Sequence, residues 1–295
     1  MKLLSIIIVT YNSENDIFDC LKSIFQYNDI GNSLEIIIVD NNSMNSNILR
    51  DNIRLLYPDV KFISNNQNSG YGQGNNIGIK ASTSPYILVM NPDVRMIMPI
   101  FSIAIEHFEK RKLDIIGMKQ LIKGNKRGNS FFWSSIYSPL ISIPLTAILN
   151  RINLYIPRYM YFSGSCFFLR KKFFNKIGLF DENIFMYKEE LDVHTRTIIN
   201  NGKIGYIKDL KYCHLHKDKI TNDKLSLKPA LLSLEIGCYL AKKYGNTTKK
   251  RIIKNMIDEC NIMLLREKIL KINRNNNPSF EEYNKSLKEK LQSIY

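Results

Sequence analysis

The sequence has few cysteines, and none of them is placed for a disulfide framework. The five cysteines of the 295-residue chain are scattered without paired spacing. Disulfide scaffolds and structural zinc sites need closely spaced pairs, so this pattern argues against both and favours a reducing compartment. The opening segment MKLLSIIIVTYN has an apolar run too short for a secretory leader with a small-residue cleavage site, and it predicts a first strand instead.

Acidic residues are also scarce. The chain has 42 Lys and Arg residues against 27 Asp and Glu residues, which gives a formal net charge of +15. A basic surface attracts anions such as nucleic acid, anionic lipid or phosphorylated small molecules. The excess is concentrated late, where residues 242–254 contain no acid, although such a run can also be an ordinary solvated helix face. Nucleic-acid binding rests on charge alone, because no helix-turn-helix, zinc-finger or RNP pattern is present, so we expect no nucleic-acid partner.

One stretch contains no charged residue at all. Residues 131–150, FFWSSIYSPLISIPLTAILN, are long enough to suggest a membrane span. Pro139, Pro144 and several serines make the stretch a poor spanning helix, so we expect a buried or interfacial insertion.

Apolar runs alternate with helical patterns through the first part of the chain. We expect strands at 3–9, 34–40, 60–64 and 86–90, with helices that end near Tyr27, Tyr57, Ser82 and Arg111. Nearly continuous apolar strands alternating with helices are typical of an α/β fold, with a mostly parallel sheet covered on both faces. Downstream we expect a strand at 161–171, a helix and turn at 172–182 and a helix at 189–202. Short edge strands or extended segments should follow at 203–207 and 211–216, and basic helices after Lys217.

Polar side chains follow three of the expected strands. They are Thr10, Tyr11 and Asn12, then Asp40, Asn41 and Asn42, then Asn91 and Asp93. Parallel strands bring their carboxyl ends to one edge, where ligands of open α/β sheets bind, so these groups should line one crevice. Each aspartate taken alone could equally be a turn former or a helix cap.

A glycine-rich segment, NQNSGYGQGNNIG at 66–78, precedes one expected helix. It has no lysine, and its glycine spacing fits neither the dinucleotide nor the P-loop pattern. We expect a loop that cradles a phosphate or a sugar ring. A basic protein with carboxylates in its cleft suggests a phosphorylated ligand held through Mg²⁺ or Mn²⁺, with Asp93 as the first candidate ligand.

Five motifs in order carry a family resemblance. They are SIIIVTYNSE, IIIVDNNS, NSGYGQGNN, VMNPDV and GLFDENIFMYKEELD. In this order they resemble the inverting family 2 glycosyltransferases of the GT-A fold, especially the bacterial rhamnosyltransferase and galactofuranosyltransferase-like branch. The resemblance covers roughly residues 3–216.

The resemblance implies a nucleotide-sugar donor, linked to UDP or dTDP, in the first half of the chain. Donor-binding residues would be Thr10, Tyr11, Asn12, Asp40, Asn42, Asn68, Gly70, Tyr71, Gly72, Asn75, Asn91 and Asp93. The NPD triplet takes the place of the family's DXD motif, so Asn91 replaces its first aspartate and Asp93 keeps the second. His214 stands where the family often has a second metal ligand, with His216 close enough to confuse the assignment.

The resemblance also implies a catalytic base in the second half. The family usually presents a Glu-Asp pair at the start of a helix, and Glu190 here takes the place of the aspartate, with Glu189 and Asp192 as alternatives. A run of acids at a helix start also has a simple electrostatic explanation. Gly164 and Ser165 would approach the donor sugar or the acceptor.

The predicted function is therefore an inverting, metal-dependent transfer of a hexosyl or deoxyhexosyl group to a glycan or lipid-linked acceptor, in surface polysaccharide or lipopolysaccharide synthesis. We expect a catalytic domain at 1–216, with a nucleotide-sugar half at 1–112 and an acceptor half at 113–216 containing an insertion at 131–160, followed by a basic helical region at 217–295. A cytoplasmic location fits, with peripheral docking of 131–150 and the basic C-terminus on an anionic membrane as one alternative and plain packing as the other. A sugar nucleotidyltransferase and an inactive nucleotide-sugar-binding module are the competing functions.

Overall fold

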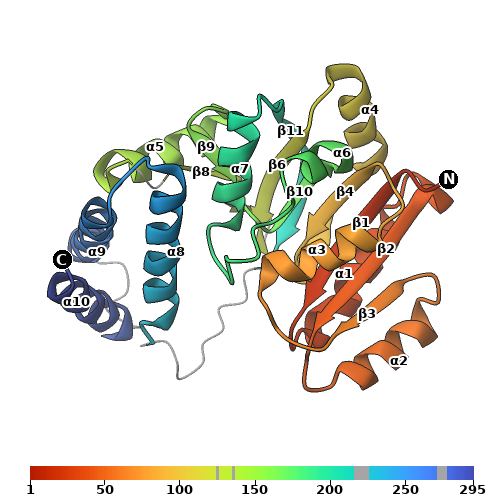
Figure 1. The fold of residues 1–295 in the computed structure, drawn as a ribbon, viewed down its shortest axis with the longest axis horizontal. Coiled ribbons are helices and arrows are strands. Elements are labelled where there is room, and N and C mark those ends of the chain that lie inside the picture. Colours follow the sequence, from red (N-terminus) through yellow and green to blue (C-terminus); the bar gives the residue numbers. More distant parts are fainter. Residues whose placement is uncertain (124–125, 135–136, 216–225, 271–277) are drawn as a thin grey trace. The chain divides into compact units, whose positions relative to one another are not determined.

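The computed structural model describes residues 1–123, 126–134, 137–215, 226–270 and 278–295. The chain forms two compact units, each built from two stretches of sequence. The first unit comprises Met1–Phe132 and Asn150–Lys217, and the second comprises Trp133–Leu149 and Asp218–Tyr295. Figure 1 shows a sheet covered by helices in the first unit and helices alone at the end of the chain.

The first unit is organised by a nine-stranded sheet in the order β3-β2-β1-β4-β10-β6-β11-β5, with β7 paired to β6; a separate small sheet pairs β8 with β9. The strands are β1 (Leu4–Thr10), β2 (Leu34–Asn41), β3 (Lys61–Asn65), β4 (Tyr86–Met90), β5 (Val94–Met96), β6 (Ile115–Ile122), β7 (Lys126–Arg127), β8 (Phe131–Trp133), β9 (Met160–Phe162), β10 (Cys166–Arg170) and β11 (Ile204–His214).

Strand direction divides this sheet into a parallel part and a mixed part. β1 is parallel to both β2 and β4, and β2 is parallel to β3. β10 runs antiparallel to β4 and β6, whereas β11 is parallel to β6 and antiparallel to β5. The predicted α/β class with a mixed, mostly parallel sheet and C-terminal helices is confirmed.

Both faces of the sheet are buried, which explains the nearly continuous apolar strands. The helices of the first unit are α1 (Glu14–Gln26), the 3-10 helix η1 (Gly31–Ser33), α2 (Ser46–Leu56), α3 (Tyr71–Ala81), α4 (Phe101–Arg111), α6 (Lys171–Lys176) and α7 (Glu189–Ile199). Ile6 and Ile8 of β1 share a core with residues of α1, α2 and α4. Ile7 points to the opposite face, where a Cβ added to Gly78 of α3 would meet it.

The predicted glycine-rich loop is wrong from Tyr71 onward, because α3 begins there. Gly74 and Gly78 lie on the face of α3 that touches the sheet: an added Cβ would come within 2.9 Å of Val9 and Asn41 at Gly74, and within 2.5 Å of Ile7 at Gly78. These glycines therefore allow a helix to lie directly on the strands, a requirement that has nothing to do with a phosphate cradle.

Several downstream predictions also need correction. The sequence did not indicate β6, and the strand expected at 161–171 is two strands, β9 and β10. The two short segments expected at 203–207 and 211–216 form one strand, β11, with an irregularity between Ile207 and Lys211. β11 lies inside the sheet between β6 and β5, so it is not an edge. Helix α7 ends at Ile199, before the predicted stop at Gly202.

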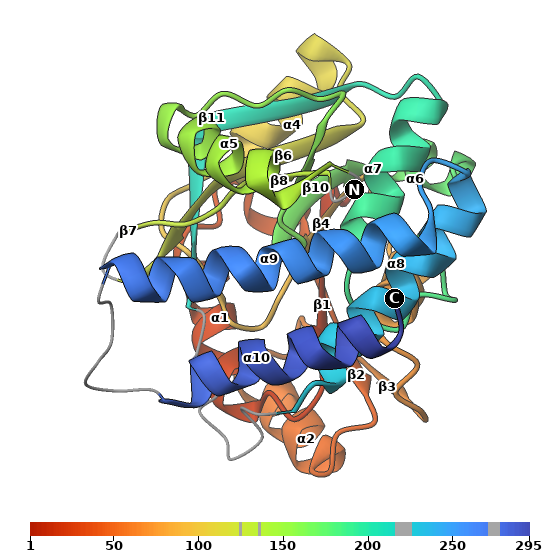
Figure 2. The same cartoon turned by 90° about the vertical axis from the view of Figure 1, so that its left-hand side faces the viewer.

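The second unit is helical. It contains α8 (Lys228–Tyr244), α9 (Lys249–Leu270), α10 (Pro278–Ser293) and most of α5 (Pro139–Ile152), whose last residues belong to the first unit. α9 and α10 lie side by side in Figure 2, and their core includes Leu234, Ile253, Cys260 and Leu291. Within the described ranges, no helix is long and apolar enough to cross a membrane.

The close approach of α3 to β1 leads to a stability prediction. Gly78→Ala should lower the free energy of unfolding by about 1–3 kcal/mol, because the added methyl group collides with the Ile7 side chain. Helix propensity alone predicts the opposite, a gain of about 1 kcal/mol. Urea unfolding distinguishes the two signs. Lys80→Ala, on the exposed side of α3, is the control and should change stability by less than about 0.5 kcal/mol.

Candidate active site

The parallel strands β1, β2 and β4 end at one edge of the sheet, and the predicted donor residues follow them. Thr10 pairs with Asp40 across β1 and β2, and its hydroxyl donates to Asp40 Oδ1 at 2.9 Å. Asp40 is fully buried, and its two oxygens also accept the hydroxyl and the N–H of Ser43. The Asp40 carboxylate therefore holds the turn after β2, as a turn former does.

The more accessible groups at this edge are an aromatic ring and two asparagines. Tyr11 is 50% exposed, directly after β1. Asn12 and Asn42 have φ angles of 49° and 64°, in the left-handed region that asparagine tolerates better than most residues. Asn12 Oδ1 also accepts the N–H of Met44, which joins the two strand ends.

The start of α3 is packed against the segment that leads into α7. Gly70 has a φ of 98°, and a Cβ there would lie 2.1 Å from the carbonyl oxygen of Phe185. The same carbonyl accepts the N–H of Tyr71 at 3.0 Å, and Asn68 Oδ1 accepts the N–H of Gly70. No side chain fits at Gly70, so this glycine fixes how the two segments meet.

The other predicted residues of this segment point into the protein. A Cβ on Gly72 would contact the Phe180 side chain at 3.0 Å. Asn75 is fully buried and donates to the Tyr71 carbonyl, and its Oδ1 has no hydrogen-bond partner among the described residues. The Tyr71 hydroxyl donates to the Gly164 carbonyl at 2.8 Å, which connects α3 to the loop between β9 and β10.

Gly164 lies against the predicted base. A Cβ on Gly164 would be 3.3 Å from the carboxyl carbon of Glu190, at the start of α7. Burial, followed by the charges of Glu189 and Glu190, raises the pKa of Tyr71. The tyrosine hydroxyl, the glycine backbone and the carboxylates therefore form one cluster, with the glycine leaving the Glu190 carboxylate uncovered on that side.

The three acids of the α7 start have different surroundings. Burial raises the pKa of Glu190, and burial together with the Glu190 charge raises the pKa of Glu189. Asp192 is fully buried, and its Oδ2 accepts hydrogen bonds from Arg196 Nε at 2.8 Å and Nη2 at 2.6 Å. Asp192 is thus neutralised by a cation one turn later, whereas Glu189 and Glu190 face each other's charge.

The backbone entering α7 is unusual. Tyr187 and Lys188 have φ angles of 74° and 65°, two consecutive non-glycine residues in the left-handed region. Such conformations are unfavourable by about 1–3 kcal/mol each and cluster at functional sites. This feature has no sequence signal, because neither residue is one that favours positive φ.

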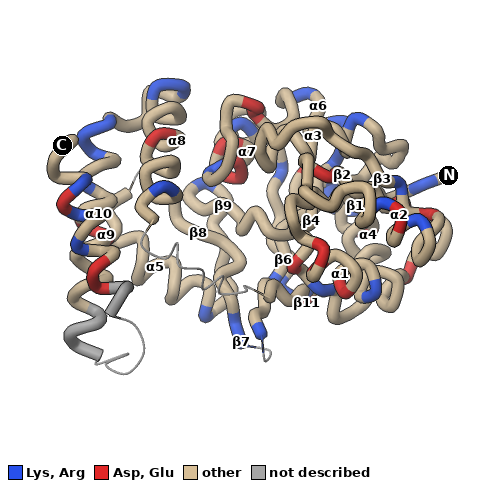
Figure 3. The backbone as a smooth tube through the Cα atoms, turned by 90° about the horizontal axis from the view of Figure 1, so that it is seen from below, with Lys and Arg blue, Asp and Glu red and all other residues tan. Residues whose placement is uncertain are grey.

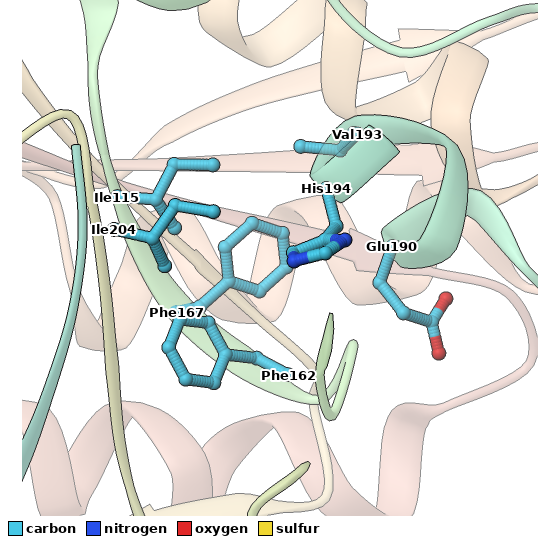
Figure 4. A pocket seen from close by; sticks show the side chains of 7 residues that line it. All are labelled: Ile115, Phe162, Phe167, Glu190, Val193, His194 and Ile204. Atoms are coloured by element: carbon cyan, nitrogen blue, oxygen red, sulfur yellow. The ribbon is translucent and has the colours of Figure 1, made fainter. Parts of the chain in front are cut away.

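An apolar pocket lies behind Glu190 (Figure 4). It holds about 270 Å³ of empty space, part of it open to solvent, and is lined by Ile115, Phe162, Phe167, Glu190, Val193, His194 and Ile204. His194 Nε2 lies 2.6 Å from the Pro157 carbonyl, and burial lowers the histidine pKa, so the ring is neutral and donates there. Glu190 therefore borders an apolar pocket, and in Figure 4 its carboxylate extends away from the apolar side chains.

The predicted metal ligands meet at the other side of this region. His214 Nε2 is 3.2 Å from Asp93 Oδ2, and the Leu215 N–H donates to the Asp93 carbonyl. Asn91 Oδ1 is buried without a hydrogen-bond partner among the described residues. The Asn91 N–H donates to the Ser165 carbonyl at 2.8 Å, directly beside Gly164.

This donor set fits a divalent cation that takes its other ligands from elsewhere. One carboxylate, one imidazole and an amide oxygen are ligand types that Mn²⁺ accepts, and such ions often add phosphate oxygens and water. No group of three or more His, Cys, Asp and Glu side chains that could hold a metal occurs in the part of the chain that the structure describes. His216 lies outside the described residues.

Gln120 and Tyr212 support this region, and neither was predicted from the sequence. Ser165 is buried, and its hydroxyl lies 3.1 Å from Gln120 Oε1 on β6 and 2.9 Å from the Tyr212 hydroxyl on β11. Tyr212 also donates to Gln120 at 3.0 Å. Gln120 belongs to the strand that the sequence did not indicate, so its role could not have been found from the pattern.

The paired glutamates predict how stability depends on pH. Their raised pKa values mean that the folded chain binds these protons more tightly than the unfolded chain, so stability falls as pH rises through the raised values. Glu189→Gln should therefore stabilise the protein relative to wild type by at least about 1 kcal/mol near pH 8, and less near pH 5.

Unfolding in denaturant at the two pH values measures this difference. The control, Asp192→Asn, should destabilise by about 3 kcal/mol at both, because it leaves the Arg196 charge without its carboxylate. Equal stabilities of wild type and Glu189→Gln at both pH values would contradict the assigned environment.

Comparison with known proteins shows similarity in sequence and in fold. The model of the family described as Glycosyl transferase family 2 matches residues 5–178. The chain is 31% identical over 212 residues to the low-salt glycan biosynthesis hexosyltransferase Agl10 of Haloferax volcanii. That match covers 68% of this chain and 64% of the relative, so the chain spans less than two thirds of the relative's length.

Solved structures share the fold at low sequence identity. The mannosyltransferase PcManGT from Pyrobaculum calidifontis, in complex with GDP-Man and Mn²⁺, has a TM-score of 0.57 at 10% identity and covers 97% of this chain and 68% of its own. TarS 1–349 from S. aureus, in complex with UDP, has a TM-score of 0.57 at 17% identity and covers 100% and 83%. Since the family model matches more than half of the chain and the fold agrees, the chain belongs to glycosyl transferase family 2 and has the GT-A fold.

Proposed function

We propose that the chain is an inverting, metal-dependent glycosyltransferase that moves a hexosyl or deoxyhexosyl group from a UDP- or dTDP-linked donor to a saccharide or lipid-linked acceptor. The single observation that carries this proposal is that Gly164 lies next to the Glu190 carboxylate. The following residue, Ser165, accepts the N–H of Asn91 at the end of β4, which brings the proposed base and the donor-side strand end into one region. The name of the Haloferax volcanii relative supports hexosyl transfer in glycan synthesis. The proposal extends to a surface polysaccharide or lipopolysaccharide product, a catalytic part at 1–216 and a basic helical part at 217–295.

On the donor side, the accessible residues suit a nucleoside diphosphate. The half-exposed Tyr11 ring offers a surface for the base, and Asn12 and Asn42 lie on the same edge of the sheet. Asp93, His214 and Asn91 would hold the divalent cation, which when bound supplies charge neutralisation on the leaving diphosphate. Asp40 contributes by fixing the turn, since both its oxygens are engaged by Thr10 and Ser43.

On the acceptor side, Glu190 is the proposed base. An acceptor hydroxyl beside Gly164 would give its proton to the Glu190 carboxylate while its oxygen forms a bond to the anomeric carbon of the donor sugar. The bond from that carbon to the diphosphate oxygen breaks at the same time, and the electron pair leaves with the nucleoside diphosphate. Attack opposite the leaving group inverts the anomeric configuration. A raised pKa makes Glu190 a stronger proton acceptor than an ordinary carboxylate.

The surroundings favour Glu190 over its two alternatives. Asp192 is bound by Arg196, which stabilises its charge and weakens it as a base. Glu189 is only 6% exposed, whereas the carboxylate of Glu190 lies next to Gly164 of the β9–β10 loop. Burial and then the Glu190 charge raise the pKa of Glu189.

Glu190→Gln should reduce kcat by at least about 100-fold while donor binding stays within about twofold, because the amide cannot accept the proton. The assay is product formation with the nucleotide sugar that most raises the melting temperature of the protein. In the wild type, activity should rise with pH through a pKa above that of an ordinary glutamate, since the base must be ionised. Glu182→Gln, an exposed acid of the segment before α7, is the control and should retain activity.

The paired substitution assigns the base. A loss in Glu189→Gln that equals or exceeds the loss in Glu190→Gln would transfer the role to Glu189. Full activity in Glu190→Gln would refute the mechanism. A protein that binds donors but shows neither transfer nor donor hydrolysis in the wild type would be the inactive binding module.

The metal pair yields a separate prediction. Asp93→Ala and His214→Ala should each weaken Mn²⁺-dependent binding of UDP by at least about tenfold, measured by calorimetry, because each removes one of two charged or imidazole ligands. Asn91→Asp should strengthen it by adding a carboxylate. Asp59→Ala, an exposed acid distant in sequence from this region, is the control. A UDP affinity that changes neither with Mn²⁺ nor with these substitutions would contradict the metal assignment.

A further inference from the structure

Helix α5 exposes several large apolar side chains. Residues 128–150 contain no charged side chain, and the tube of α5 is correspondingly tan over most of its length in Figure 3. Its exposed large apolar side chains are Leu140 at 66%, Ile141 at 63%, Ile148 at 56% and Ile152 at 59%, and Arg151 of its last turn is exposed beside them. Pro144 and Ala147 are exposed as well. At 3.6 residues per turn these positions lie on one side of the helix.

The opposite side of α5 buries two polar residues. Thr146 and Asn150 are buried, and the Thr146 hydroxyl oxygen accepts the N–H of Trp133 at 3.1 Å. The Asn150 amide accepts the N–H of Ser130 and donates to the Phe131 carbonyl. A surface helix of a globular protein normally turns its apolar side inward and its polar side to water. In α5 the buried Leu149 and the exposed Arg151 follow this rule, but most of its large apolar side chains face outward while Thr146 and Asn150 face inward.

Positive charge accompanies this helix in the second unit. Asn255 of α9 donates to the carbonyl of Tyr137, two residues before α5 begins, which places this part of α9 beside the start of α5. The preceding turns of α9 expose basic side chains, and residues 242–257 contain no acid; the bases are Lys242, Lys243, Lys249, Lys250, Arg251 and Lys254. The Lys and Arg positions of α8 and α9 are marked in Figure 3.

We propose that α5 lies in the surface of an anionic lipid bilayer, with its exposed apolar side in the boundary between headgroups and acyl chains and the bases of α9 on the anionic headgroups. The helix has 14 residues, about 21 Å, which is too short to span a hydrocarbon core of about 30 Å. An apolar helix face flanked by lysine and arginine is the arrangement that binds at such an interface. A second copy of this chain would bring like charges together, so charge complementarity favours an anionic surface.

This inference deepens the proposed function by placing the chain where a lipid-linked acceptor would be found, but its test does not depend on transfer activity. The probe is sedimentation of the full chain with vesicles of phosphatidylcholine alone, or of phosphatidylcholine with phosphatidylglycerol. We expect at least about tenfold stronger partition onto the anionic vesicles at low salt, and weaker partition as sodium chloride is added.

The variants separate the two parts of the surface. Leu140→Gln, Ile141→Gln and Ile148→Gln together should lower partition at least about tenfold, and Lys249→Glu with Lys250→Glu should lower it by a similar factor on anionic vesicles only. The matched controls lie in the first unit: Leu55→Gln with Leu56→Gln, at 80% and 60% exposure, and Lys172→Glu with Lys176→Glu. Both controls should change partition less than about twofold.

Three results would overturn the proposal. The first is wild-type protein that stays in solution with both kinds of vesicle. The second is partition that the α5 substitutions leave unchanged, because the apolar side would then not be the contact. The third is a vesicle-free dimer that the α5 substitutions dissociate, measured by sedimentation velocity, which would make this side an interface between two copies. Circular dichroism of each variant confirms that the loss is not unfolding.

Discussion

The hydrogen bond from the Asn91 N–H to the Ser165 carbonyl is the contact on which the candidate site depends. It continues the antiparallel ladder of β4 and β10 by one step beyond the pair Met90 and Cys166. On one side of it the chain runs on to Asp93, which meets His214, and on the other it passes Gly164, which meets Glu190. Asp93 and Glu190 are far apart in the sequence, and this backbone contact joins the two segments that lead to them.

Close packing of α3 completes the same arrangement from the other side. The glycines on its inner face let the helix lie on β1 and β2. Gly70 has no side chain and so leaves room for the Phe185 carbonyl, which accepts the N–H of Tyr71, the first residue of α3. Tyr71 is thereby aimed at the Gly164 carbonyl, so α3, the β9–β10 loop and the entry to α7 are held together. The positive φ angles of Tyr187 and Lys188 are maintained by this packing, because a lone segment would relax them.

The sequence predicted the strands that are buried on both faces of the sheet. It missed or divided the strands whose place depends on hydrogen bonding to their neighbours and whose residues are partly polar. Strands β1, β2 and β4 are uninterrupted apolar runs and were expected, whereas β6 was not, because Lys119 and Gln120 interrupt its pattern. β11 was divided in two because Lys208 and Asp209 are exposed at its irregularity. The glycines of residues 66–78 indicated a loop, although a helix that packs closely on a sheet also requires glycine. At the α7 start Glu190 was the predicted base, with Glu189 and Asp192 as alternatives, and the Arg196 contact that sets Asp192 apart is visible only in the structure.

The most direct test of the account is the position of bound manganese relative to Glu190. In crystals grown with Mn²⁺ and UDP, an anomalous difference map should place the metal in bonding contact with Asp93 and His214. The diphosphate should lie on the metal, on the side that faces Gly164 and Glu190. A manganese peak elsewhere, or UDP bound with its diphosphate directed away from Glu190, would contradict the claim that these residues form one glycosyl-transfer site.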